Sequence, residues 1–178
     1  SFVCSLEENI DELDINKVIS NEKKRIAKIF KNAKLENLDN KTNFDEDSNT
    51  EQVKKEQLIK DLVIAADTFI AYRPSFRLHT IIAGYPWFLD WGRDSLISFE
   101  GLLLKTKRYD LAKEVLKTMM RDIKYGLVPN GYSGFDNRPL YNSVDASLLL
   151  FEQIQKYLEY TGDDEFVEKI LDKLETII

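Results

Sequence analysis

Residues 84–104 read GYPWFLDWGRDSLISFEGLLL. Aromatic and charged residues crowd the first half of this stretch, both tryptophans of the chain among them, and an almost continuous apolar run follows. All four prolines and six of the seven glycines lie between residues 74 and 139, so the irregular backbone is concentrated around it. Such a stretch is either a corner of the core or a functional site.

The segments that follow this stretch alternate in character. After Gly92 the apolar residues lie on almost every side of a predicted helix, which is typical of a helix buried on all faces. The next predicted helix, over about residues 109–124, is amphipathic. After a loop at residues 127–145, a second apolar helix covers about residues 146–160, and a second amphipathic helix follows it. We therefore predict an all-α protein.

The alternation indicates a two-layer helical toroid, in which inner apolar helices alternate with outer amphipathic ones. Short connections make neighbouring helices antiparallel, so two successive inner helices run parallel. The segments before them, residues 84–94 and 137–145, are then expected at the same end of the toroid. No fixed-period repeat supports an array of helical repeats instead. The side chains expected to meet at this end are Trp87, Trp91, Arg93, Asp94, Tyr141, Asn142 and Asp145.

The first third of the chain is organised differently. Apolar residues at helical spacing predict a helix over about residues 8–34. The polar, acidic segment at residues 36–51 is interpreted as a linker or exposed loop. A further helix is predicted over about residues 56–72, ended by Pro74. We expect residues 1–50 to be a lead-in from a preceding domain and residues 51–178 to be the N-terminal part of the toroid.

Composition excludes several classes of function. The net charge of -6 and the pI near 5.0 argue against a nucleic-acid or anionic membrane partner, because either requires a basic surface. A single cysteine, Cys4, and a single histidine, His79, exclude an internal disulfide framework and leave no basis for a Cys/His metal site. We therefore expect no metal and no cofactor, and a reducing, cytoplasmic compartment.

The residue types at the expected rim suit a carbohydrate. Sugars present hydroxyl groups at their edges and C–H groups on their faces, so sugar sites combine aromatic rings with planar, charged hydrogen-bonding groups. Phosphate binding would require a Gly-rich loop with a lysine, which the sequence lacks. Hydrolysis of a glycosidic bond additionally requires a carboxylic acid and a second carboxylate.

Three segments together carry a family resemblance. They are TIIAGYPWFLDWGRDSLISFEGLLL (residues 80–104), KRYDLA (residues 107–112) and LVPNGYSGFDNRPLYNSVDASLLLFEQIQKYLEYTGD (residues 127–163). In this order they closely resemble the C-terminal glucosidase part of glycogen debranching enzymes, the amylo-alpha-1,6-glucosidases. The resemblance covers about residues 56–163, and residues 1–50 resemble the connection that follows a β-rich domain in bacterial members.

This resemblance implies an (alpha/alpha)6 barrel, incomplete in this chain, and hydrolysis with inversion of the alpha-1,6-linked glucose at branch points of glycogen or another alpha-glucan. It assigns the general acid to Asp145 and the base to a residue after Ile178, so the 178-residue chain alone is expected to have little or no activity. The WGRD segment is also similar to glucoamylases, which implies that Arg93 and Asp94 hold glucose hydroxyls while Trp91 lines the pocket. Trp87, Tyr141 and Asn142 complete the expected substrate-binding set.

Structural roles explain the same residues without catalysis. Asp94 and Asp145 both lie near predicted helix N-termini, where an aspartate stabilises a helix by about 0.5–2 kcal/mol as a cap or dipole partner. A helix N-terminus also favours the ionised carboxylate, which is the wrong direction for a general acid. If Asp145 is the acid, burial or neighbouring carboxylates must raise its pKa.

Arg93 equally suits an ordinary ion pair with Asp90 or Asp94, and Trp87 and Trp91 equally suit a core. The alternative function is therefore a non-catalytic helical scaffold module that binds an alpha-glucan.

Overall fold

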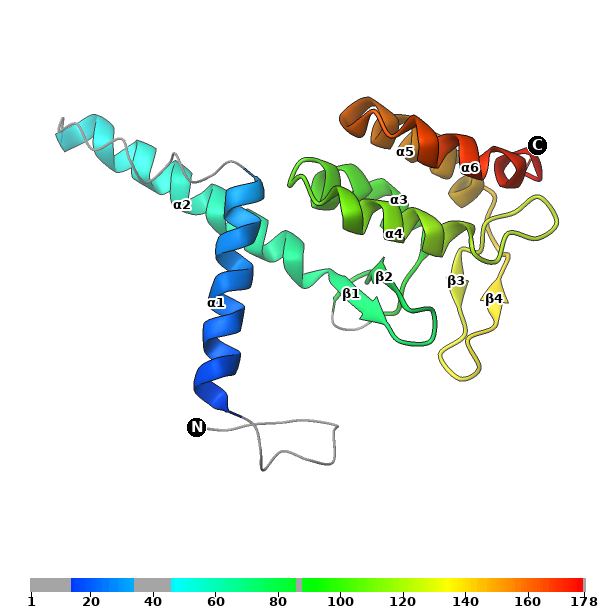
Figure 1. Cartoon of the computed structure of the whole chain (residues 1–178), viewed down its shortest axis with the longest axis horizontal. Coiled ribbons are helices and arrows are strands. Elements are labelled where there is room, and N and C mark those ends of the chain that lie inside the picture. The colour runs from blue at the N-terminus through cyan, green and yellow to red at the C-terminus, as the bar shows by residue number, and fades with distance from the viewer. Residues whose placement is uncertain (1–13, 34–45, 86–87, 178) are drawn as a thin grey trace.

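The computed structural model describes residues 14–33, 46–85 and 88–177 of the chain, with the side chains of residues 46–50 and 52 left aside. Trp87 and Cys4 lie outside the described residues. Helices dominate the described part (Figure 1), so the all-α class is confirmed there. The helices are α1 (Ile15–Asn32), α2 (Glu46–Thr68), α3 (Gly92–Phe99), the π-helical segment η2 (Glu100–Leu104), α4 (Tyr109–Met120), α5 (Asp145–Thr161) and α6 (Asp164–Glu175).

Two small antiparallel hairpins accompany the helices, and neither was predicted from the sequence. The first joins β1 (Ile70–Arg73) to β2 (Leu78–Ile81), and the second joins β3 (Gly131–Tyr132) to β4 (Pro139–Leu140). The second hairpin lies inside the segment predicted as a continuous loop at residues 127–145. Its strands are too short to give a periodic apolar pattern.

The boundaries of α2 differ from the prediction at both ends. The helix begins at Glu46, so the last residues of the predicted linker are helical, and the proposed boundary at residue 50 lies inside α2. It ends at Thr68 rather than near Tyr72, because residues 70–73 pair with β2 instead. β2 in turn packs on α4, where the Thr118 hydroxyl donates to the His79 carbonyl at 2.8 Å. These tertiary contacts override the helical pattern.

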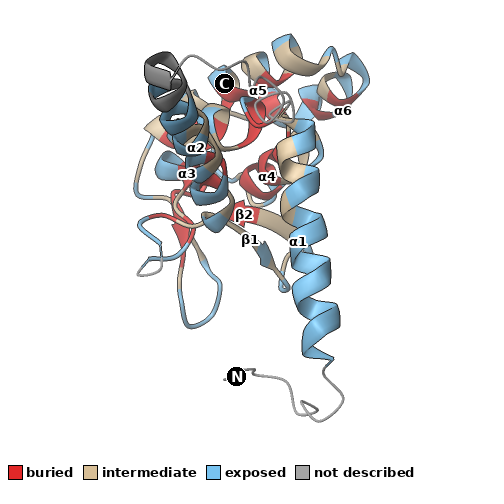
Figure 2. Cartoon of the chain, turned by 90° about the vertical axis from the view of Figure 1, so that its left-hand side faces the viewer, coloured by how far each residue is buried: buried red, intermediate tan, exposed pale blue. Residues whose placement is uncertain are grey.

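The core lies where α3, η2, α4 and α5 meet (Figure 2). The amphipathic stripe predicted for α4 is confirmed, since Val115 and Leu116 are fully buried. Leu150 of α5 is also fully buried, and α6 adds Phe166. By contrast α1 buries none of its residues and is exposed along most of its length. The other fully buried core residues are Leu96, Phe99, Leu103, Leu104, Ala112, Val128 and Ala146.

The two apolar helices are not buried on all faces in the described part of the chain. Ile97 of α3 is 64% exposed and Leu148 of α5 is 67% exposed. Each helix packs one side against the shared core, and no other described element covers the opposite side. The prediction of all-round burial is wrong for these residues.

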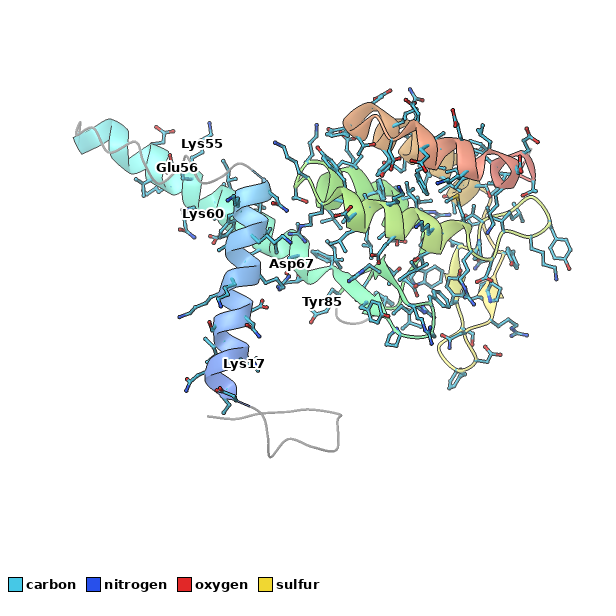
Figure 3. The ribbon with its side chains drawn as sticks, viewed as in Figure 1. Lys17, Lys55, Glu56, Lys60, Asp67 and Tyr85 are labelled. Carbon is cyan, nitrogen blue, oxygen red and sulfur yellow. The ribbon has the colours of Figure 1, made fainter. Side chains whose placement is uncertain are left out.

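Asp67 links the N-terminal helices to the core. This residue, labelled in Figure 3, lies in the last turn of α2 and accepts from Arg25 of α1 at 2.5 Å. It also accepts from Arg108, the residue before α4, at 2.7 Å.

Among the described residues no helix has both the length and the apolar character needed to cross a bilayer.

Gly92 allows the start of α3 to lie against the loop that leads to α5. A Cβ at this position would lie 2.7 Å from the Pro129 carbonyl oxygen and 3.3 Å from the Ala146 Cβ. The Gly92 amide donates to the Asn130 carbonyl at 2.8 Å, which fixes this approach. No side chain fits without a shift of the backbone.

We therefore expect Gly92→Ala to lower the free energy of unfolding by about 1–3 kcal/mol, the usual effect of overpacking. Denaturant unfolding followed by circular dichroism measures the loss. Gly101→Ala is the matched control, because a Cβ at Gly101 meets nothing within 4 Å. It should be neutral or stabilising by up to about 1 kcal/mol. Equal stabilities of the two variants would contradict the packing role of Gly92.

Candidate active site

An ion pair joins the first turns of α3 and α5. Arg93, the second residue of α3, points its Nε at Oδ2 of Asp145, the first residue of α5. The Ser143 hydroxyl donates to Oδ1 of Asp145 and accepts from Arg93 Nη2 at 3.3 Å. The Ala146 amide donates to the same Oδ1 at 2.9 Å. The two segments that the sequence analysis expected at one end of the protein therefore meet at Arg93 and Asp145.

Both charged side chains remain accessible to a ligand. The side chain of Arg93 is 52% exposed and that of Asp145 is 39% exposed. The pair thus presents a guanidinium and a carboxylate at the surface, each with directions left for further hydrogen bonds.

Asn130 fixes the backbone behind this pair, and the sequence analysis did not identify it. Its Oδ1 accepts from the Arg93 amide at 3.2 Å, and its Nδ2 donates to Asn142 Oδ1 at 3.4 Å. Its own amide donates to the Leu140 carbonyl at 2.9 Å. Asn130 is 7% exposed. The Pro-Asn-Gly turn at residues 129–131 was the available signal, but a turn pattern does not reveal that its asparagine is buried.

Trp91 lies against the second hairpin. The residue pairs with Gly131 in an isolated antiparallel bridge, and its ring carbon Cε3 lies 3.5 Å from the position that a Cβ on Gly131 would take. The residue is partly buried. Trp87, its expected companion, lies outside the described residues.

Tyr141 and Asp94 are directed to other neighbours. The Tyr141 hydroxyl donates to the Asp122 carbonyl at 2.6 Å, close to the C-terminal end of α4. Asp94 lines a shallow, mainly apolar pocket together with Phe69, Ile97 and others, and this pocket includes neither Arg93 nor Asp145. Of the expected set, the structure joins Arg93 to Asp145 directly and Asn142 to them through Asn130.

The structural alternatives are resolved in part by these contacts. Arg93 pairs with Asp145, not with Asp90 or Asp94. Neither candidate aspartate is an N-cap residue, since Trp91 caps α3 and Val144 caps α5, both without a side-chain hydrogen bond. Asp94 and Asp145 instead lie in the first turns, where a carboxylate interacts favourably with the helix dipole.

The surroundings of Asp145 hold its carboxyl group ionised. The Ser143 hydroxyl and the Arg93 guanidinium together lower its pKa below the ordinary value of an aspartate. In this geometry Asp145 is a hydrogen-bond acceptor. It has neither the deep burial nor the neighbouring carboxylate that would raise the pKa of a general acid.

The described residues contain no group of three or more His, Cys, Asp or Glu side chains arranged to hold a metal ion. The site consists of a guanidinium, a carboxylate, amide groups and the indole of the partly buried Trp91. These groups can hold the hydroxyls and the C–H face of a sugar ring.

Comparison with known proteins agrees with this chemistry. The family described as amylo-alpha-1,6-glucosidase matches residues 64–178, which include every candidate site residue. The chain belongs to the amylo-alpha-1,6-glucosidase family. One relative is the glycogen debranching enzyme of Saccharomyces cerevisiae (strain ATCC 204508 / S288c), which is 35% identical over 97 residues. The matched region is 52% of this chain and spans 6% of the length of the yeast enzyme.

We expect the pKa of Asp145 to rise toward its ordinary value in Ser143→Ala, which removes the largest contribution, and also in Arg93→Gln. A carbon-detected NMR titration of the carboxyl group measures both shifts. Because folding lowers this pKa, ionised Asp145 stabilises the fold above its unfolded pKa, and the contribution is lost as the pH falls through the folded value.

Asp136 at the tip of the second hairpin is the internal control. Its pKa is lowered by Ser133 and by the backbone of Arg138, and neither variant changes these groups. An unchanged Asp145 pKa in both variants would contradict the assigned hydrogen bonds.

Proposed function

We propose that the protein containing this chain is a glycoside hydrolase that releases alpha-1,6-linked glucose from branch points of glycogen or a similar alpha-glucan, with inversion at the anomeric carbon. The observation that carries this proposal is the exposed Arg93–Asp145 pair, which lies within the segment that matches the family. The glycogen debranching enzyme of yeast supports the choice of substrate. We place the activity in the cytoplasm.

We also propose that residues 51–178 form the N-terminal part of an (alpha/alpha)6 barrel. The apolar helices α3 and α5 pack on each other and begin beside each other, as successive inner helices of such a barrel would. Their exposed faces, which carry Ile97 and Leu148, would then be inner-wall positions.

In the proposed reaction Asp145 donates its proton to the glycosidic oxygen as the bond from that oxygen to the anomeric carbon breaks. A water molecule attacks the anomeric carbon from the opposite face, and a second carboxylate takes its proton. We assign this base to a residue after Ile178. The terminal glucose would lie between Trp91 and Arg93. The resemblance to glucoamylases adds Asp94 as a further contact, and the expected meeting of the two segments adds Trp87, Tyr141 and Asn142. Asp94 and Tyr141 would have to leave their present neighbours to reach the sugar.

The low pKa of Asp145 imposes a condition on this mechanism. While Ser143 donates to it and Arg93 pairs with it, the carboxyl group is held ionised and cannot donate a proton. We propose that Arg93 leaves Asp145 when glucose binds and donates to the sugar hydroxyls instead. Loss of the positive neighbour, together with exclusion of water by the sugar, would raise the pKa of Asp145. The half-exposed side chain of Arg93 leaves room for this rotation.

The same observation favours one alternative. If Arg93 stays on Asp145 in the complex, the site binds an alpha-glucan without hydrolysing it and the protein is a scaffold module. The two functions differ in whether the full-length wild-type protein releases glucose from the bound alpha-glucan.

In the full-length protein, Asp145→Asn should reduce glucose release from a short alpha-1,6-branched glucan by about 10²–10⁴-fold, the usual contribution of a general acid. Calorimetry should show that binding of the same glucan persists, because the amide keeps most of the hydrogen-bonding shape. Asp136→Asn, on the exposed hairpin tip, should retain wild-type turnover. Unchanged turnover in Asp145→Asn would remove this residue from the acid's role.

Arg93→Gln tests the glucose-holding role separately. A charged hydrogen bond to a sugar hydroxyl contributes about 1.5–3 kcal/mol, so the dissociation constant of a maltose-like ligand should rise about 10- to 100-fold. Arg138→Gln, an exposed arginine on the second hairpin, is the matched control and should bind normally. Wild-type affinity in Arg93→Gln would show that the pocket assignment is wrong.

A further inference from the structure

A second, buried ion pair lies at the segment that leads to α3, and the proposed mechanism does not use it. Asp90 has a side-chain exposure of 2%, and its Oδ1 pairs with Nη1 of Arg73, which is 14% exposed. The Thr80 hydroxyl donates to the other carboxylate oxygen of Asp90 at 3.2 Å. The carboxylate is thus paired and hydrogen-bonded on both oxygens, as a buried charge requires.

Arg73 also reaches the second hairpin. Its Nη2 donates to Asn137 Oδ1 at 2.6 Å. The centre of its guanidinium lies 4.2 Å from the Phe76 ring centre and 4.9 Å from that of Tyr132 in β3. One side chain therefore ties together the first hairpin, the segment before α3 and the second hairpin.

The segment before α3 and the second hairpin are the parts of the chain that position Arg93. Asp90 directly precedes Trp91, which bridges to Gly131, and the Gly92 amide donates to the Asn130 carbonyl. Asn130 in turn accepts from the amide of Arg93. Only Trp91 and Gly92, the first residue of α3, separate Asp90 from Arg93 in sequence, and Trp91, Gly92 and Arg93 each contact Asn130 or Gly131.

We infer that Arg73 and Asp90 are positioning residues, which hold the segment before α3 against the second hairpin so that Arg93 faces Asp145. Displacements of about 1 Å are sufficient to impair a catalytic arrangement, so a loosened pair would act on the site without touching the substrate. The catalytic consequence rests on the proposed function, whereas the placement of Arg93 does not.

A conservative variant separates positioning from mere stability. Arg73→Lys keeps the positive charge beside Asp90 but loses the planar fork that serves Asp90 and Asn137 together, and it loses the stacked guanidinium. Asp90→Asn removes the charge while keeping the shape. Arg77→Lys, an exposed arginine in the turn of the same hairpin, is the matched control.

The deciding measurement is the NMR titration of Asp145 in each folded variant. Its charged and polar neighbours are Ser143 and Arg93, so a displaced Arg93 should move its pKa upward. We expect this rise in Arg73→Lys and Asp90→Asn but not in Arg77→Lys. In an Arg93→Gln background, Arg73→Lys should cause no further rise in the pKa of Asp145, because the charged side chain through which Arg73 acts on Asp145 is then already absent.

An Asp145 pKa that is unchanged in folded Arg73→Lys overturns the inference, as does an equal rise in the Arg93→Gln background. If Asp90→Asn does not fold, the Arg73→Lys result decides alone. This titration needs no substrate, so it decides the positioning role even if the wild-type protein hydrolyses no alpha-glucan.

The effect of Arg73 on catalysis is measured in the full-length protein. Arg73→Lys should lower kcat for glucose release about tenfold while the unfolding midpoint stays above the assay temperature, and Arg77→Lys should match wild type. Unchanged kcat in Arg73→Lys, with active wild-type enzyme, would overturn the catalytic part of the inference.

Discussion

The candidate site depends on the close approach of α3 to the loop before α5, which is possible because Gly92 has no side chain. Its amide bonds to the Asn130 carbonyl, and its Cα faces Pro129 and Ala146 at distances that exclude a Cβ. This contact brings two helix N-termini together although about fifty residues separate them in sequence. Arg93 and Asp145, in the first turns of these helices, then form an ion pair.

Two ion pairs of different character lie along the same segment. Arg73–Asp90 is buried, its guanidinium lies against two aromatic rings, and both oxygens of its carboxylate accept hydrogen bonds, so it suits a fixed structural contact. Arg93–Asp145 is about half exposed, and exposed pairs are weak because water and salt screen them. A sugar hydroxyl can therefore displace one partner of the Arg93–Asp145 pair more readily than a ligand could break the buried Arg73–Asp90 pair. The segment thus combines a rigid anchor at Asp90 with an exchangeable contact at Arg93.

The acid role that the family resemblance assigns to Asp145 must be reconciled with the lowered pKa of its carboxyl group. The resemblance assigns proton donation to Asp145, while Ser143 and Arg93 hold that carboxyl group ionised. Both hold if the bound sugar displaces Arg93, since the pKa of a carboxyl group follows its immediate partners. Arg93 would then have two successive roles, helping Ser143 to keep Asp145 ionised before the sugar binds and holding hydroxyls in the complex.

The sequence by itself determined the helical class, the start of α4, both ends of α5 to within one residue, and the stop at Gly162, because apolar periodicity and caps are local properties of the chain. It placed the end of α4 four residues too late, and it indicated that two distant segments meet. It also showed the family resemblance, because each motif that carries the resemblance is a run of residues adjacent in sequence. Only the tertiary structure decided that residues 70–73 pair as a strand and that Asn130 is buried between the two helix starts. It also decided that Asp90 pairs with Arg73 while Arg93 pairs with Asp145. Partners of buried polar groups come from distant segments, and no periodic pattern records which donor the folded chain brings to which acceptor.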